Sequence, residues 1–146
     1  AGELPPLGPA RSRKAHRAIG ALLLLAVVGH IGGLWLTSPP DVIDALLLAS
    51  PTPFSLWGVI AMWAVFGAGL MAVLRRRVRL RPLTWRRLHV GMAVIIAATT
   101  VAHAALIDGT MELITKIGLS LLVLTATARV AYLTWRMGKK RGPGGP

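Results

Sequence analysis

The sequence predicts an all-α fold, a polytopic membrane bundle of four transmembrane helices. Three observations support this prediction. Hydrophobic residues make up 54% of the 146 residues and the mean hydropathy is +0.63, which is more apolar than a soluble domain of this size tolerates on its surface. Four long apolar runs follow one another along the chain. Most of the 17 Lys and Arg residues fall in short clusters between those runs.

The first apolar run covers residues 18–36 and follows a Pro- and Gly-rich leader that we expect to form a loop. At about 1.5 Å per residue, a helix of this length nearly covers a hydrocarbon core of about 30 Å. The sequence Thr-Ser-Pro-Pro at 37–40 is expected to end the helix, because consecutive prolines cannot continue it. A short interfacial helix is expected over residues 42–49.

Three further spans are predicted in the remaining chain. Each is a long apolar run ended by charged or turn-forming residues, namely the arginine-rich block at 74–87, the Asp-Gly pair at 108–109 and the basic C-terminal tail. The runs cover residues 54–74, 88–107 and 111–135.

The charges of the loops predict the orientation. The segments before the first run, between the second and third, and after the fourth carry 4, 7 and 4 basic residues respectively. The positive-inside rule places these segments, including both ends of the chain, in the cytoplasm. The membrane is expected to be the inner membrane of the cell. The other two loops carry only acidic charges, Asp41, Asp44, Asp108 and Glu112. The expected organisation is a cytoplasmic leader at 1–15, a transmembrane domain at 16–136 and a basic tail at 137–146.

Composition also narrows the function classes. In a soluble protein, a formal net charge of +12 would favour a nucleic-acid partner. Because the basic residues lie between apolar runs, we expect no nucleic-acid binding. The chain has no cysteine, which excludes disulfides, iron–sulfur clusters and covalently attached c-type haem. Histidine remains the main candidate for a metal ligand.

The chain has only four histidines, and they form two pairs with the same spacing. His16 and His30 are 14 residues apart in the first helix, and His89 and His103 are 14 apart in the third. Fourteen residues advance about 21 Å and almost four turns, so both members of a pair share one helix face. The two helices run in the same direction, since one span separates them. His16 therefore lies at the depth of His89, and His30 at the depth of His103.

Two facing imidazoles at each of two depths are what two b-type haems with bis-histidine ligation require. A lone histidine in a membrane helix is often a packed residue or part of a proton path, but the repeated spacing favours ligation for the set. Small residues near each histidine would let a porphyrin approach, although Gly and Ala are also common at membrane helix contacts. Leu23 and Ile96 lie midway and are expected to form an aliphatic floor between the haems.

Two basic residues lie inside the fourth span, Lys116 and Arg129. Charges within an apolar span are costly, and two interpretations remain open. Each side chain can snorkel to a nearby helix end, or each can pair with haem propionates. By depth, Arg129 suits the inner haem and Lys116 the outer haem.

The patterns HRAIG…GH at 16–30 and WRRLH…VAH at 85–103 resemble the ferric reductase-like transmembrane domain family. That family includes eukaryotic ferric reductases, NADPH oxidases and the haem subunit of a bacterial methionine sulfoxide reductase system. The resemblance extends over about residues 10–136, and the segments 37–63 and 106–116 are similar to small bacterial members. It implies two haems b between the two histidine-bearing helices, with ligands at the four histidines.

The sequence departs from the family pattern in two respects. The family usually has six spans, and the four here correspond to the last four, so we expect further spans upstream. No Gly-rich phosphate loop follows a strand anywhere in the chain, so a flavin or nicotinamide domain is not expected in it. The resemblance therefore implies a separate electron donor.

The predicted function is transmembrane electron transfer as a ferric reductase-like, haem-containing oxidoreductase component. The chain would lie in the lipid bilayer. Electrons would pass through it from a cytoplasmic flavoprotein or quinol to an external acceptor such as ferric iron or a partner reductase. One alternative is a haem-binding subunit that serves a partner reductase of the methionine sulfoxide reductase type. Another is a haem-free membrane assembly subunit. A proton or ion conductor is disfavoured, because no acidic residues connect the two histidine levels.

Overall fold

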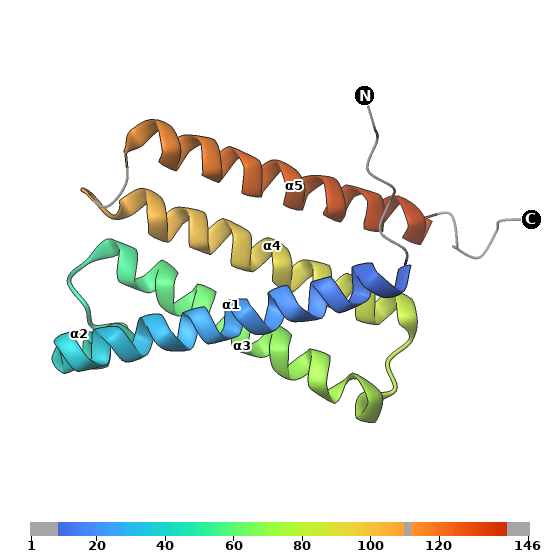
Figure 1. The fold of residues 1–146 in the computed structure, drawn as a ribbon, viewed down its shortest axis with the longest axis horizontal. Helices are drawn as coiled ribbons and strands as arrows, with labels where there is room; N and C mark the ends of the chain where they lie inside the picture. Colours follow the sequence, from blue (N-terminus) through green and yellow to red (C-terminus); the bar gives the residue numbers. More distant parts are fainter. Residues whose placement is uncertain (1–8, 110–111, 140–146) are drawn as a thin grey trace, which may run out of the picture.

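A computed structural model of the chain describes residues 9–109 and 112–139. Over these residues the regular secondary structure is α-helical, with no strand, which confirms the predicted all-α bundle (Figure 1). The helices are α1 (Pro9–Thr37), α2 (Pro39–Leu46), α3 (Pro53–Val78), α4 (Pro82–Leu106) and α5 (Leu113–Lys139).

Four helices in the described part of the chain are long and apolar enough to cross a membrane, namely α1, α3, α4 and α5. The apolar part of each has 23–28 residues, and about 20 are enough for the hydrocarbon core. Large apolar side chains on them are exposed, for example Leu36 at 86% and Leu25 at 68%. Such a surface is stable against lipid and not against water. The chain is therefore a multi-pass membrane protein.

The pair of prolines at 39–40 separates two helices. α1 ends at Thr37, as predicted, and α2 begins at Pro39, three residues earlier than expected. Proline cannot continue a helix, but its fixed φ suits the first helical positions. Ser38 between the helices donates a hydrogen bond of 2.6 Å from Oγ to Asp41 Oδ2. A short helix is thus present where one was predicted, with each end three residues earlier; it ends at Leu46, two residues before Leu48, whose φ is +59°.

The transmembrane helices extend beyond the predicted apolar runs at their basic ends. α1 begins at Pro9 and so includes the arginines before the apolar run, α3 continues to Val78, and α4 already begins at Pro82. Hydropathy detects only the part of a helix within the hydrocarbon, whereas backbone hydrogen bonding continues into the headgroup region, where Arg and Lys are favourable. Arg79, with a φ of 45°, makes the left-handed turn that ends α3.

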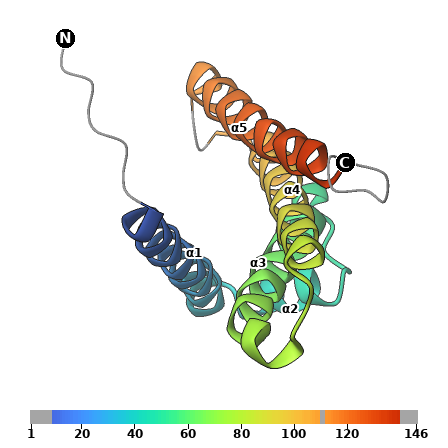
Figure 2. The same cartoon turned by 90° about the vertical axis from the view of Figure 1, so that its right-hand side faces the viewer.

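The helices form an open arc in which α3 is central. α3 packs most extensively on α4, α4 packs on α5, and α1 packs on α2 and α3. Viewed along the bundle, α1 and α5 lie at opposite ends of the arc (Figure 2). α1 and α4 run in the same direction, as predicted, and the basic ends of all four long helices lie at one end of the molecule (Figure 1). This arrangement lets α1 and α4 present side chains to the same space beside α3.

Candidate functional site

The first histidine pair lies near the basic end of the bundle. The rings of His16 on α1 and His89 on α4 have centroids 5.9 Å apart and planes at 79° to each other. A metal–imidazole bond is about 2 Å long, so two rings bound to one iron from opposite sides have centroids about 6 Å apart. The separation of the two rings therefore fits axial ligation of one iron atom.

An aromatic stack supports His89. The ring of Trp85, one turn earlier on α4, is stacked on the imidazole with a centroid distance of 5.6 Å and an angle of 13°. The guanidinium of Arg75, near the end of α3, lies over the same Trp85 ring, 4.9 Å from its centroid. Residues four apart on a helix face each other, so the Trp-x-x-x-His spacing in the sequence was a signal for this contact that the sequence analysis did not use.

The Nδ1 atom of His89 is buried and has no hydrogen-bond partner among the described residues. A buried polar atom without a partner costs about 1–3 kcal/mol, so such atoms often mark a place where a further group binds. A coordinated metal ion is one group that satisfies an imidazole nitrogen.

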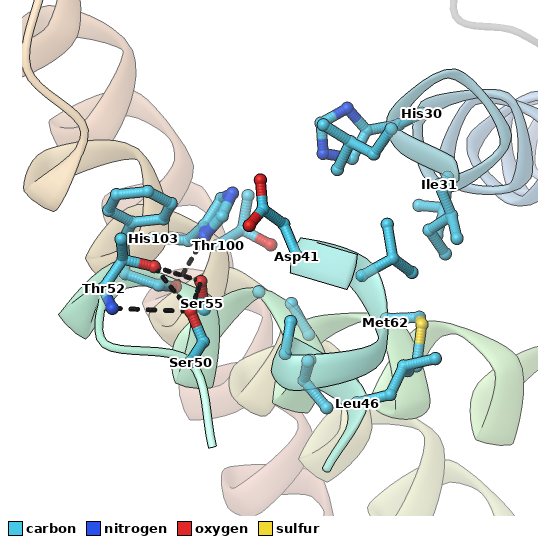
Figure 3. A pocket seen from close by; sticks show the side chains of 18 of the residues that line it. His30, Ile31, Asp41, Leu46, Ser50, Thr52, Ser55, Met62, Thr100 and His103 are labelled. Atoms are coloured by element: carbon cyan, nitrogen blue, oxygen red, sulfur yellow. Dashed lines mark hydrogen bonds between the residues drawn. The ribbon is translucent and has the colours of Figure 1, made fainter. Parts of the chain in front are cut away.

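The second histidine pair lines a cavity of about 640 Å³ at the acidic end of the bundle. His30 on α1 and His103 on α4 face this cavity from opposite sides (Figure 3). Its walls come from α1, α2, α3 and α4 and are mainly aliphatic, and its volume lies in the usual range for cofactor sites. Leu23 and Ile96, which the sequence analysis expected between the two levels, also line it.

The imidazole of His103 is held by the backbone of α3. Its Nδ1 atom lies 2.8 Å from the carbonyl oxygen of Phe54, and the Phe54 ring meets the imidazole edge to face at 5.8 Å. A carbonyl oxygen only accepts hydrogen bonds, so in the neutral imidazole Nδ1 carries the hydrogen and Nε2 keeps its lone pair. This is the tautomer that a metal-ligating histidine needs.

Polar side chains gather at one side of the cavity, beside the start of α3. Ser50 Oγ lies 2.9 Å from Thr52 Oγ1 and donates a hydrogen bond of 3.1 Å to Ser55 Oγ (Figure 3). Asp41 of α2 also lines the cavity. The cavity is therefore apolar along the helices and polar beside the loop before α3, which suits an apolar ligand with polar substituents.

Lys116 and Arg129 lie outside this cavity. Both are on α5, which packs only on α4 among the described helices. Lys116 Nζ donates a hydrogen bond of 2.6 Å to the carbonyl oxygen of Ile107, the residue that follows the last turn of α4. Lysine thus satisfies a carbonyl at a helix C-terminus, where positive charge is favourable. Arg129 is exposed on α5. Neither side chain contacts a histidine of the two pairs in this arrangement.

Replacing Lys116 by methionine is expected to lower stability without removing any bound haem. The change deletes a charge-assisted hydrogen bond, which is worth about 1.5–3 kcal/mol. Thermal unfolding in detergent measures the stability, and the absorbance of bound haem in the same sample measures its content. Arg129→Met is the matched control on α5 and should change neither. Loss of haem from Lys116→Met at unchanged melting temperature would instead favour a propionate partner.

The described residues contain no group of three or more His, Cys, Asp or Glu side chains that could hold a metal ion. What they offer is imidazoles in pairs, from two helices that face each other across an apolar space. Imidazole is a good ligand for iron, and a haem iron needs only two axial ligands because the porphyrin supplies the other four. The donor set present therefore fits haem better than a free metal ion.

The chain matches the model of a known protein family. Residues 3–100 match the family model of the ferric reductase-like transmembrane component. The match includes His16, His30 and His89 and ends three residues before His103. No curated protein and no solved structure matches the chain. The family generally binds haem and has a transmembrane oxidoreductase-type role. Since the match covers well over half of the chain, this protein belongs to the ferric reductase-like transmembrane component family.

Proposed function

We propose that this chain carries electrons across the membrane through two b-type haems, from a cytoplasmic donor to an external acceptor. His16 and His89 hold the inner haem, and His30 and His103 hold the outer one. The single observation that supports this best is that the four histidines meet in two pairs, one by ring contact at the basic end and one across a common cavity at the other. The helical domain of residues 16–136 is the electron-carrying unit.

The protein's task at each level is to hold and shield the cofactor. Haem, when bound, supplies one-electron exchange between ferric and ferrous iron. His103 is oriented by the Phe54 carbonyl and His89 by the indole of Trp85. The aliphatic walls of the cavity exclude water and lower the local dielectric, which are two means by which proteins tune haem potential. Leu23 and Ile96 separate the two levels.

The charges at the two ends of the bundle support the direction of transfer. The basic end carries the arginines of α1, α3 and α4 and suits an acidic flavoprotein donor or a quinol at an anionic lipid surface. Asp41, at the outer cavity, and Asp108, which is exposed near the end of α4, give the opposite end a negative charge. That end suits a cation such as ferric iron or a partner reductase. We place the basic end in the cytoplasm and the protein in the cell membrane.

Impermeant maleimide should label a cysteine at Asp108 from outside the cell and should fail to label one at Val78 until the membrane is opened. The chain has no native cysteine, and both positions are exposed. Asp108 follows the last turn of α4 at one end of the bundle, and Val78 ends α3 at the other end. Labelling is followed by gel shift on intact cells and on lysed cells. Labelling of Val78→Cys alone in intact cells would invert the inner and outer levels.

Electron transfer across a bilayer tests the proposed function. The full-length protein is reconstituted in liposomes with a ferric chelate trapped inside, and an impermeant reductant is added outside. Protease cleavage of the C-terminal tail measures the fraction of chains whose cytoplasmic end faces the reductant, and the rate of iron reduction is referred to that fraction. We expect trapped ferric iron to be reduced far faster than in empty liposomes, and reduction to stop in His16→Ala and in His30→Ala. Haem that reduces readily while no trapped acceptor changes would contradict transmembrane transfer.

A further inference from the structure

We infer that Gly58 is a positioning residue for His103, because its missing side chain opens the Phe54 carbonyl to the imidazole of the neighbouring helix. This inference rests on the proposed function only in naming the iron of the outer haem as the metal that His103 ligates. The Gly58 surface and the Phe54 carbonyl together form the place where the His103 imidazole lies, which we call the seat. The seat is a feature of the α3–α4 contact and concerns the imidazole alone.

The first argument is steric. A Cβ atom built at Gly58 would lie 2.8 Å from both Cε1 and Nδ1 of His103 and 3.5 Å from its Nε2. Carbon and nitrogen atoms that are not bonded do not approach to 2.8 Å, so the imidazole must move when any other residue stands at position 58. The atoms in conflict belong to a side chain with two rotatable bonds. The ring can therefore move away while the helices stay in place.

The second argument is the direction of side chains on a helix. Every Cα–Cβ bond of an α-helix tilts toward the N-terminus, so a side chain covers the turn before it. One turn before Gly58 is Phe54, whose carbonyl oxygen accepts the hydrogen bond from His103 Nδ1 at 2.8 Å. A side chain at position 58 would stand between that carbonyl and α4. Glycine is unfavourable within a helix, and here it leaves a backbone acceptor open to another helix.

The third argument is the chemistry of a ligand imidazole. A hydrogen bond from Nδ1–H fixes the tautomer, directs the Nε2 lone pair to the metal and raises the basicity of the ligand. A more basic axial ligand stabilises ferric iron relative to ferrous iron, so the seat lowers the reduction potential of the haem that His103 binds. The atoms that the seat contacts are those of His103, a residue of the outer pair. The seat is therefore expected to act on the outer haem alone.

Gly58→Ala in the full-length protein tests the inference, with Gly67→Ala as the matched control. Gly67 is on the same helix, and a Cβ there meets only the flexible end of Met92, at 3.0 Å. We expect Gly58→Ala to raise the midpoint potential of one haem in a redox titration, to change the g-values of that haem, which report the orientation of its axial rings, and to leave the other haem unchanged. Gly67→Ala should leave the outer haem as in the wild type.

Nitrogen NMR of the histidine side chains gives a readout that does not depend on haem. In protein with ¹⁵N-labelled histidine, His103 should show a protonated, hydrogen-bonded Nδ1 in the wild type and in Gly67→Ala, and should lose that signal in Gly58→Ala. If Gly58→Ala does not accumulate, the wild-type spectrum alone decides, because a His103 protonated at Nε2 overturns the inference. Unchanged potentials and an unchanged His103 signal in Gly58→Ala would also overturn it. Wild-type protein that has the predicted tautomer and binds no haem would overturn the proposed function and leave the seat standing.

Discussion

Replacing either member of a histidine pair by alanine is expected to remove one of two haems, and the same haem for both members of the pair. His16→Ala and His89→Ala should each lose the inner haem, while His30→Ala and His103→Ala should each lose the outer one. The reason is that an iron held by two histidines loses one of its two axial bonds when either histidine is removed, and the first pair has its rings 5.9 Å apart. Haem content per chain should therefore fall by about half in every single variant.

Double variants distinguish the pairing from a general loss of folding. His16→Ala combined with His89→Ala should retain as much haem as either single change, because both remove the same site. His16→Ala combined with His30→Ala should retain none. This is the non-additivity expected of residues that act together. If the double variant of His16→Ala and His103→Ala retained as much haem as either single variant, the prediction that His16 and His89 share one depth would be wrong.

Filling the outer cavity should expel the outer haem without touching a ligand. Ala26 lies one turn before His30 on α1 and lines the cavity of about 640 Å³. In Ala26→Trp a large indole would occupy space between α1 and α4 that a porphyrin needs. We expect loss of the outer haem and retention of the inner one, measured by the haem-to-protein ratio and by the single midpoint potential that remains.

Leu25→Trp is the matched control for this change. Leu25 is the adjacent residue on α1, is 68% exposed and does not line the cavity, so a tryptophan there would face lipid, where large apolar side chains are tolerated. It should bind both haems. Retention of both haems in Ala26→Trp would mean that the outer haem lies elsewhere than in this cavity.

Much of the fold could be predicted from hydropathy, because a helix within a bilayer must be apolar and must satisfy its own backbone. The limits of that reasoning appear at the helix ends. Residues 9–17 are helical although they are rich in Arg and Lys, and α4 begins at Pro82, before its apolar run. At those ends helical hydrogen bonding continues while the surroundings change from hydrocarbon to headgroups, so composition no longer marks the boundary.

The histidines could be predicted as a set because their spacing is a property of one helix at a time. The contacts that hold the histidine rings in place could not be predicted from the sequence. The contact of His103 with the Phe54 carbonyl joins positions 49 residues apart, and the role of Gly58 depends on where α4 crosses α3. Lys116 illustrates the same limit, since its bond to Ile107 depends on how the chain turns between α4 and α5. Tertiary contacts of this kind leave no periodic signal in the sequence.

Counting haem in the purified full-length protein tests the central claim most directly. A pyridine haemochrome assay with quantitative amino-acid analysis gives the type of haem and the number per chain. The proposal predicts two haems b per chain, both six-coordinate and low-spin, because each level offers two imidazoles. Protein that is folded, carries all four histidines and yet binds no haem, or only one per chain after haem is supplied in excess, would contradict it.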